Sequence, residues 1–273
     1  MSAETAAKDV PSPLMRQTLL NPQLVRPATS KSVRRLLPWL KVIKIGGHSI
    51  MDRGAEAVLP VVEELAAAFA DHRLLITTGT GLRGRHVYSV GLELGLPTGV
   101  LAALASTDAE KNGHMLAALM AEHGVVYLPH DSIARHLAAF LSAAPAVVAN
   151  GYPPYGLYEF PSGGGRIPTH RADAGPFLIG DAYGAAQVLY VDDVDGIYTA
   201  DPKDDPSAEL IPSITAADLL ARDLPSLPID RIVLHLMGSA KHVRSIQVVN
   251  GLTKGLITRA LAGEHVGTIV TAA

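Results

Sequence analysis

Two short glycine-rich segments carry the residue types that best suit chemistry on a phosphate group. They read Lys44-Ile45-Gly46-Gly47 and Thr78-Gly79-Thr80-Gly81-Leu82-Arg83, and each continues an apolar run typical of a buried strand. Glycine lets backbone N–H groups approach an anion closely where a strand turns into a helix. Lys44 and Arg83 would add full positive charges beside these turns, where phosphoryl charge spreads in a transition state. The two segments therefore predict an anion site that uses Lys44, Gly46, Gly47, Gly79, Thr80, Gly81 and Arg83.

Two common nucleotide-binding patterns explain these glycines less well. Gly79, Gly81 and Gly84 fit the G-x-G-x-x-G spacing of NAD-binding turns. That turn opens the first βαβ unit, and an acidic residue follows it by about 20 positions. Here the turn follows the second predicted strand, and Thr98–Leu104, where the acid belongs, is uncharged. An NAD-binding protein is therefore the least favoured reading, and the sequence has no P-loop pattern either.

Two acidic segments further along the chain are candidates for the same site. Arg171–Gly175 reads R-A-D-A-G, and Val191–Pro202 reads V-D-D-V-D-G-I-Y-T-A-D-P. Asp173 falls at a predicted helix start, where a carboxylate is stabilised by the helix dipole. It would position either Mg²⁺ or the Lys44 ammonium. Asp-Gly and Asp-Pro pairs more commonly mark plain turns, which remains the alternative for the second segment.

The elements that must position these residues alternate between strand and helix. The apolar runs are short and continuous, which predicts a parallel sheet covered by helices on both faces. Tyr152–His170, with four prolines and Gly163–Gly165, interrupts the alternation as a long irregular loop. The predicted strands are Lys41–Ile45, Leu74–Thr78, Val125–Leu128, Ala146–Ala149, Gln187–Val191, Ser245–Asn250 and Gly267–Val270. The predicted helices are Ala55–Ala70, a helix ending at Glu93, Asp108–His123, Ser132–Leu141, Ala174–Tyr183, Asp230–Arg244 and a short one before Gly263.

The composition excludes several classes of protein. The 273 residues carry 48% hydrophobic residues, a formal net charge of -3 and no cysteine. This balance does not indicate nucleic acid as a partner, and the lack of cysteine is compatible with the cytoplasm. The uncharged run Leu137–Tyr158 contains prolines that would break a spanning helix, so no membrane segment is expected. We expect a basic arm over residues 1–35 and one folded domain over residues 36–273.

The order of these motifs resembles the amino-acid kinase superfamily, and within it the bacterial uridylate kinases. The resemblance covers about residues 41–270 and rests on K-I-G-G, T-G-T-G-L-R, R-A-D-A-G and V-D-G-I-Y-T-A-D-P. It implies a three-layer α/β/α sandwich with a mainly parallel central sheet, and a nucleotide across the carboxyl edge of that sheet. It also implies ATP contacts at Asp192, Tyr198 and Asp201, and catalytic roles for Lys44 and Asp173.

Further segments are similar to the subunits of molybdenum storage proteins. They include L-L-P-W-L-K-V-I-K-I-G-G, M-D-R-G-A, N-G-H-M-L-A-A-L and F-P-S-G-G-G-R-I-P-T-H. This likeness implies a cage of six identical or homologous subunits that binds Mg²⁺ and ATP and stores molybdate or tungstate as polyoxometalate. His130, His136 and His170 would then be the candidate oxoanion contacts. His170, next to Arg171 and Asp173, is equally suited to the nucleotide site. Packing or surface roles are the alternative for each histidine.

The departures from these relatives keep two functions open. Uridylate kinases carry hydroxyl residues where this chain has Ala172 and Ala174, and an aspartate where the matching residue is taken to be His235. Both changes favour storage over efficient phosphoryl transfer, because neutral imidazole cannot act as an anionic acceptor. However, the loop that begins P-P-Y lacks the histidine run of one storage subunit type. The main hypothesis is a storage subunit, and the alternative is a uridylate kinase-like phosphotransferase in which Arg83 holds the acceptor phosphate.

Overall fold

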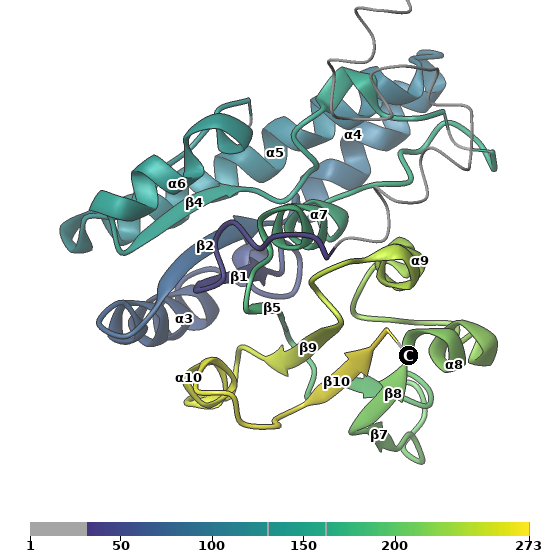
Figure 1. Ribbon diagram of the computed structural model, residues 1–273. Helices are drawn as coiled ribbons and strands as arrows, with labels where there is room; N and C mark the ends of the chain where they lie inside the picture. The colour runs from purple at the N-terminus through teal and green to yellow at the C-terminus, as the bar shows by residue number, and fades with distance from the viewer. Residues whose placement is uncertain (1–31, 130, 162, 273) are drawn as a thin grey trace, which may run out of the picture. The chain divides into compact units, whose positions relative to one another are not determined.

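The computed structural model describes residues 32–129, 131–161 and 163–272, and residues from Arg35 onward form one compact unit. An eight-stranded sheet runs through this unit in the order β3-β4-β2-β1-β5-β9-β10-β8 (Figure 1). All neighbouring strands in it are parallel except β9 and β10. The strands are β1 (Leu40–Ile45), β2 (Arg73–Thr78), β3 (Val126–Tyr127), β4 (Ala146–Asn150), β5 (Gln187–Asp192), β8 (Ser213–Thr215), β9 (Ser245–Asn250) and β10 (Thr268–Thr271). A separate two-stranded pair joins β6 (Ile197–Tyr198) to β7 (Leu210–Ile211).

Helices cover both faces of the sheet. The α-helices are α3 (Ala55–Ala68), α4 (Leu82–Glu93), α5 (Thr98–Leu119), α6 (Ile133–Ala143), α7 (Ala174–Tyr183), α8 (Ala216–Arg222), α9 (Arg231–Ser239) and α10 (Leu256–Leu261). Single 3-10 turns occur at η2 (Met51–Arg53), η3 (Ala121–His123) and η4 (Gly156–Tyr158). Apolar residues of α3, α10 and the end of α5 pack on one face, and those of α6, α7, α8 and α9 pack on the other.

Side chains alternate between the two faces of the sheet along each strand, and this divides the core into two main clusters. Val42 and Leu75 point into the cluster under α6 to α9, whereas their neighbours Ile43 and Ile76 point into the cluster under α3 and α10. Successive residues of a strand face opposite sides of its sheet, so a strand buried on both faces reads as a continuous apolar run. The three-layer α/β/α sandwich with a mainly parallel sheet is therefore confirmed.

Two predicted helix boundaries were wrong. The helix predicted at Asp108–His123 begins ten residues earlier, because Leu101 and Ala105 pack in the interior on the same helical face as Ala109. The helix predicted at Asp230–Arg244 ends at Ser239. Residues 241–243 instead donate their backbone N–H groups to the Asp181 carboxylate, which a continuing helix would prevent.

Candidate functional site

The carboxyl ends of three neighbouring strands place the predicted segments side by side. In the parallel registers, Ile45 at the end of β1 pairs with Thr78 of β2 on one side and with Val191 of β5 on the other. The turns that follow these strands therefore leave the sheet at one level. This edge is where parallel α/β sheets bind their ligands.

The two glycine turns touch each other. A Cβ atom on Gly47 would lie 2.3 Å from the Gly81 backbone nitrogen and 2.7 Å from the Gly79 carbonyl carbon. Gly81 also has a φ of +69°, which residues with side chains rarely adopt. Glycine at these positions is therefore a steric requirement of the turns. The same requirement leaves backbone rather than side chains at the wall of the cleft.

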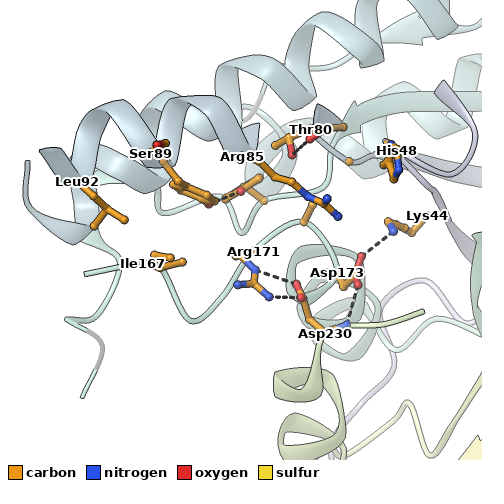
Figure 2. Close-up of a pocket in the computed structure, with 16 residues that line it drawn as sticks. Lys44, His48, Thr80, Arg85, Ser89, Leu92, Ile167, Arg171, Asp173 and Asp230 are labelled. Carbon is orange, nitrogen blue, oxygen red and sulfur yellow. Dashed lines mark hydrogen bonds and ion pairs between the residues drawn. The ribbon is translucent and has the colours of Figure 1, made fainter. Parts of the chain in front are cut away.

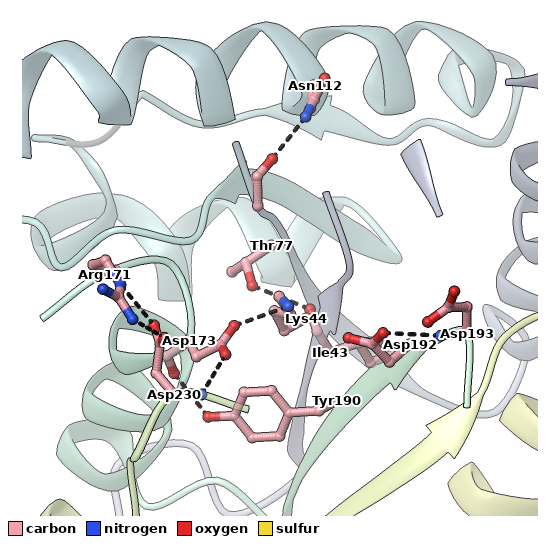
Figure 3. A network of polar contacts seen from close by, with 11 residues as sticks. Ile43, Lys44, Thr77, Asn112, Arg171, Asp173, Tyr190, Asp192, Asp193 and Asp230 are labelled. Carbon is pink, nitrogen blue, oxygen red and sulfur yellow. Dashed lines mark hydrogen bonds and ion pairs between the residues drawn. The ribbon is translucent and has the colours of Figure 1, made fainter. Parts of the chain in front are cut away.

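Lys44 projects from β1 into this edge and is held by Asp173. The two side chains are 8% and 9% exposed, and Lys44 Nζ lies 2.9 Å from Asp173 Oδ1 (Figure 3). Burial alone would lower the pKa of Lys44, but the charges of Asp173, Asp192 and Asp230 outweigh burial and raise it. The ammonium therefore stays charged throughout the physiological range, as a phosphate-binding lysine requires.

Asp173 is positioned by its own surroundings at the start of α7. Its Oδ2 accepts the backbone N–H of Asp230 at 2.8 Å, and its carbonyl oxygen accepts the Tyr190 hydroxyl at 2.8 Å. The Tyr190 side chain lies on the face of β5 that α6 to α9 cover. Asp173 therefore links the centre of the sheet to the start of α9, and its carboxylate has little freedom to move away from Lys44.

A second ion pair extends this network. The Arg171 guanidinium contacts both carboxylate oxygens of Asp230, at 3.3 Å from Nε and more closely from Nη2. Burial raises the pKa of Asp230, and repulsion from Asp173 adds to that effect against the attraction of Arg171 and Lys44. Burial also raises the pKa of Asp192 on the other side of Lys44. The neighbouring carboxylates of Asp173 and Asp230 thus lie between two cations, Lys44 and Arg171.

The position of Asp230 corrects the sequence comparison at His235. His235 is the sequence match to the uridylate kinase aspartate, but it is exposed on α9 and does not line the cleft. Asp230, at the N-terminal boundary of the same helix, supplies a carboxylate beside Asp173 instead. The cleft therefore contains a second carboxylate beside Asp173, and the exposed His235 gives no reason to exclude phosphoryl transfer.

Three adjoining cavities run along this edge of the sheet. The first, of about 540 Å³, holds Lys44, Gly47, Gly79, Thr80, Gly81 and Asp173 in its wall (Figure 2). The second, of about 490 Å³, shares Lys44 and Gly47 and reaches Asp192. The third, of about 180 Å³, is lined by Asp192, Tyr198 and Asp201. Gly46 lies directly before the shared wall, where a Cβ atom would meet Ser49.

Not every predicted residue reaches the cleft. Arg83 contacts Asn112 and faces Asp52, and Arg85, two residues further along α4, enters the first cavity in its place (Figure 2). His136 is exposed on α6, and the His170 ring lies 3.1 Å from Glu159 Oε1. His130 lies outside the described residues. Among the described residues, no group of three or more His, Cys, Asp or Glu side chains is arranged to hold a metal ion.

The far wall of the first cavity was not anticipated. Tyr88 of α4 and Tyr152 after β4 meet with hydroxyl oxygens 2.5 Å apart. Burial raises the pKa of Tyr88 to about 12, so its hydroxyl is a neutral hydrogen-bonding group at physiological pH. Tyr152 opens the P-P-Y segment, which the sequence had marked only as irregular. No pattern in the sequence pairs it with a tyrosine 64 positions earlier.

The sequence profile of the Amino acid kinase family matches residues 39–261, and the chain belongs to this family. Molybdenum storage protein subunit beta of Azotobacter vinelandii is 47% identical to it over 259 residues, which are 95% of this chain and 96% of the relative. The uridylate kinase of an Arthrobacter species is 27% identical over 267 residues, covering 89% of this chain and 96% of the kinase. The chain is therefore a homologue of a storage protein subunit within a kinase family.

Solved structures agree on the fold. UMP kinase from Bacillus anthracis superposes with a TM-score of 0.63 at 18% identity, covering 86% of this chain and 97% of the kinase. Uridylate kinase from Archaeoglobus fulgidus gives a TM-score of 0.65 at 20% identity, covering 85% and 99%. None of the helices in the described part of this chain has the length and apolarity that a bilayer crossing needs.

Proposed function

We propose that this chain is an ATP-binding subunit that stores molybdenum, or tungsten, as polyoxometalate in a hexameric cage in the cytoplasm. The observation that carries the proposal is the buried Lys44–Asp173 pair between two interlocked glycine turns. This pair occurs in a chain that is 47% identical, over nearly its full length, to a molybdenum storage protein subunit. Binding of ATP would then drive the accumulation of molybdate as cargo.

The residues present suit the phosphates of ATP. Lys44 offers a charged donor, and the walls at Gly47, Gly79 and Gly81 are backbone that a Cβ atom would obstruct. The third cavity, framed by Asp192, Tyr198 and Asp201, would take the base end of the nucleotide. Fixed positive charge and close backbone donors stabilise phosphate charge without reorganisation.

The residues also suit Mg²⁺ that arrives with ATP. Mg²⁺ in nucleotide sites usually rests on substrate phosphates and one or two carboxylates. Asp173 and Asp192 flank Lys44 and would be those carboxylates, and the metal would neutralise phosphate charge there. A bound cation would also keep Asp192 ionised despite the burial that raises its pKa.

His136 and His170 remain proposed oxoanion contacts, together with His130. His136 is exposed on α6 and is therefore accessible to cargo. His170 has its backbone N–H and its ring nitrogen near the same Glu159 oxygen, so that carboxylate would hold the imidazole in one orientation. Imidazole is a common ligand of transition metals.

The alternative function is phosphoryl transfer to a nucleoside monophosphate. A specific observation favours it: the cavity of about 540 Å³ beside Lys44 also contains Arg85, Arg171 and Asp230. Lys44 would neutralise charge on the transferred γ-phosphoryl group, and Arg85 would hold the acceptor phosphate. In that reaction an acceptor oxygen attacks the γ-phosphorus and ADP leaves.

A measurement of the molybdenum retained per chain distinguishes storage from phosphoryl transfer. The protein would be incubated with Mg-ATP and molybdate, desalted, and analysed for molybdenum beside an ATP-free control and beside a sample with UMP and ATP. Many molybdenum atoms per chain, retained only with ATP, support storage. Retention equal to the control, together with UDP formation, would overturn the storage proposal in favour of the kinase.

A further inference from the structure

Asp52 connects the two glycine turns. It lies in η2, and its backbone N–H donates to the Gly47 carbonyl oxygen at 2.9 Å, which fixes it to the first turn. Its side chain crosses to the second turn, where Oδ2 accepts the Leu82 N–H at 2.7 Å. The residue as a whole is exposed, yet its side chain is only 14% exposed. One residue therefore holds both turns.

The Asp52 carboxylate occupies the N-terminus of α4. Leu82 is the first residue of this 12-residue helix, its N-cap is Gly81, and its first turn contains no acidic residue. A Cβ atom on Gly81 would lie 2.3 Å from Asp52 Oδ2. Helix N-termini favour anions because of their unpaired N–H groups and the helix dipole. Here the anion is the protein's own carboxylate, supplied from another element.

Basic groups surround this carboxylate as they would a bound phosphate. His48 Nδ1 lies 3.7 Å from Oδ2, and Arg83 Nη1 lies 3.9 Å from Oδ1. Asp52 also lines the cavity of about 490 Å³ that contains Lys44 and Arg85. A fixed negative charge at this wall repels a polyanion in the same cavity, and the repulsion increases with the charge of the ligand.

We propose that Asp52 is a specificity-determining residue of this cleft. Its carboxylate takes the place of a phosphate oxygen at the start of α4 and holds the turns in their binding geometry before a ligand arrives. It directs the bound phosphates towards Lys44 and Arg85, and it selects ATP with its charge partly neutralised by Mg²⁺ over free ATP. This inference rests on the proposed function, since it requires ATP in the cleft.

The substitution Asp52→Asn removes the negative charge of the side chain but can keep its hydrogen bond, because an asparagine oxygen can still accept the Leu82 N–H. Affinity for ATP would be measured by calorimetry with and without Mg²⁺, at low and at high salt. We expect Asp52→Asn to bind Mg-free ATP about tenfold more tightly and Mg-ATP about threefold more tightly at low salt. Both gains should shrink at high salt, because exposed charges are screened.

Two further variants control this experiment. Glu56→Gln removes an exposed charge in the first turn of α3, outside the three cavities, and should leave both affinities unchanged. Asp52→Ala removes the acceptor as well, so the Leu82 amide should exchange hydrogen faster than in wild type or Asp52→Asn. Faster exchange in Asp52→Ala alone would support the linking role.

The outcomes that contradict the inference differ from those that contradict the proposed function. If wild type binds ATP but Asp52→Asn binds Mg-free ATP no more tightly, the inference is overturned and ATP binding stands. A loss of Mg-ATP affinity in Asp52→Asn would overturn it as well, because Asp52 would then be a metal ligand. If wild type binds no ATP, the proposed function fails and the inference fails with it.

Discussion

The Lys44 ammonium and the Asp173 carboxylate stabilise each other at a place that neither could occupy alone. Both side chains are more than nine-tenths buried, and each has given up most of its hydration. Burying a single charge costs several kcal/mol, which a close partner recovers only in part. The pair is therefore better suited to holding a ligand than to stabilising the fold.

Substitution of Lys44 tests this interpretation at the level of single residues. Lys44→Met should destabilise the protein by about 3–5 kcal/mol, because it leaves the Asp173 charge buried without its partner. The double variant Lys44→Met/Asp173→Asn should recover much of that loss, since no buried charge is stranded. Urea unfolding measures both. Equal stability of the single and double variants would contradict the coupling. Calorimetry should show that both lose ATP affinity by at least about tenfold, a loss of 1.4 kcal/mol or more.

At the level of elements, the contact between the two glycine turns makes a steric prediction. Gly47→Ala should reduce ATP affinity by at least about tenfold, because its Cβ atom would separate the turns that converge at Gly81. Gly238→Ala is the matched control, since a Cβ atom there meets nothing within 4 Å inside α9. The control should keep its affinity and gain about 0.5–1 kcal/mol in stability. Calorimetry and thermal unfolding distinguish the two variants, and equal affinities would refute the steric argument.

The link between α7 and the segment before β9 predicts a pH dependence. Three backbone N–H groups, from residues 241–243, donate to the Asp181 carboxylate. Burial would raise the pKa of Asp181, but these donors outweigh it and lower the pKa. A lowered folded-state pKa contributes stability above the unfolded value, about 3.9, and that stability is lost as pH falls through the folded value.

Asp181→Asn should therefore cost about 1–3 kcal/mol at pH 7, because charge-assisted hydrogen bonds are lost. The difference from wild type should begin to shrink as pH falls below about 4, where the unfolded chain takes up the proton, and should vanish below the lowered pKa of the native carboxyl group. Denaturant unfolding across this pH range measures the difference. A difference that stays constant down to the lowest pH would show that the charge of Asp181 is not responsible.

The sequence predicted the elements whose signals are local. The β strands with continuous apolar runs and α7, bounded by Asp173 and Gly184, lie where expected. The start of α5 was missed although residues 101–105 are all strong helix formers, so a local helical signal was present there. The glycine at position 99 and the β-branched residues Thr98 and Val100 weaken that signal at the very start of the helix.

The part of the site that lies at the ends of the strands could be predicted from the sequence, and the rest could not. Lys44 lies near the end of β1, and the glycines follow β1 and the adjacent parallel strand β2, so their meeting at one edge follows from the fold. Asp230, Arg85 and Asp52 reach that edge from a helix boundary, a helix face and a 3-10 turn. Their convergence depends on tertiary distances, which sequence spacing does not contain. That His235 is exposed on α9, away from the cleft, could not be predicted for the same reason.

At the level of the whole molecule, the compact unit from Arg35 onward contains both apolar clusters. A variant lacking residues 1–31 should therefore keep its circular dichroism and an unfolding free energy within about 1 kcal/mol of wild type, because the two clusters of the described residues begin at Leu37. Sedimentation of the same variant tests the proposed hexamer. Assembly lost with the fold intact would assign the arm to subunit contacts. A large loss of stability would contradict an independent domain.

Lys44 lies on β1, which is hydrogen-bonded to β2 on one side and to β5 on the other. This position would link the binding of a nucleotide to the lifetime of the protein. Lys44, the proposed phosphate-binding cation, cannot leave its position unless the middle of the sheet separates, so only the folded protein would hold a nucleotide. A protease that cleaves the unfolded chain would then act more slowly by the factor 1 + [ATP]/Kd. When ATP is scarce, the empty subunit becomes the more readily degraded one, and the amount of this protein would follow the energy supply of the cell.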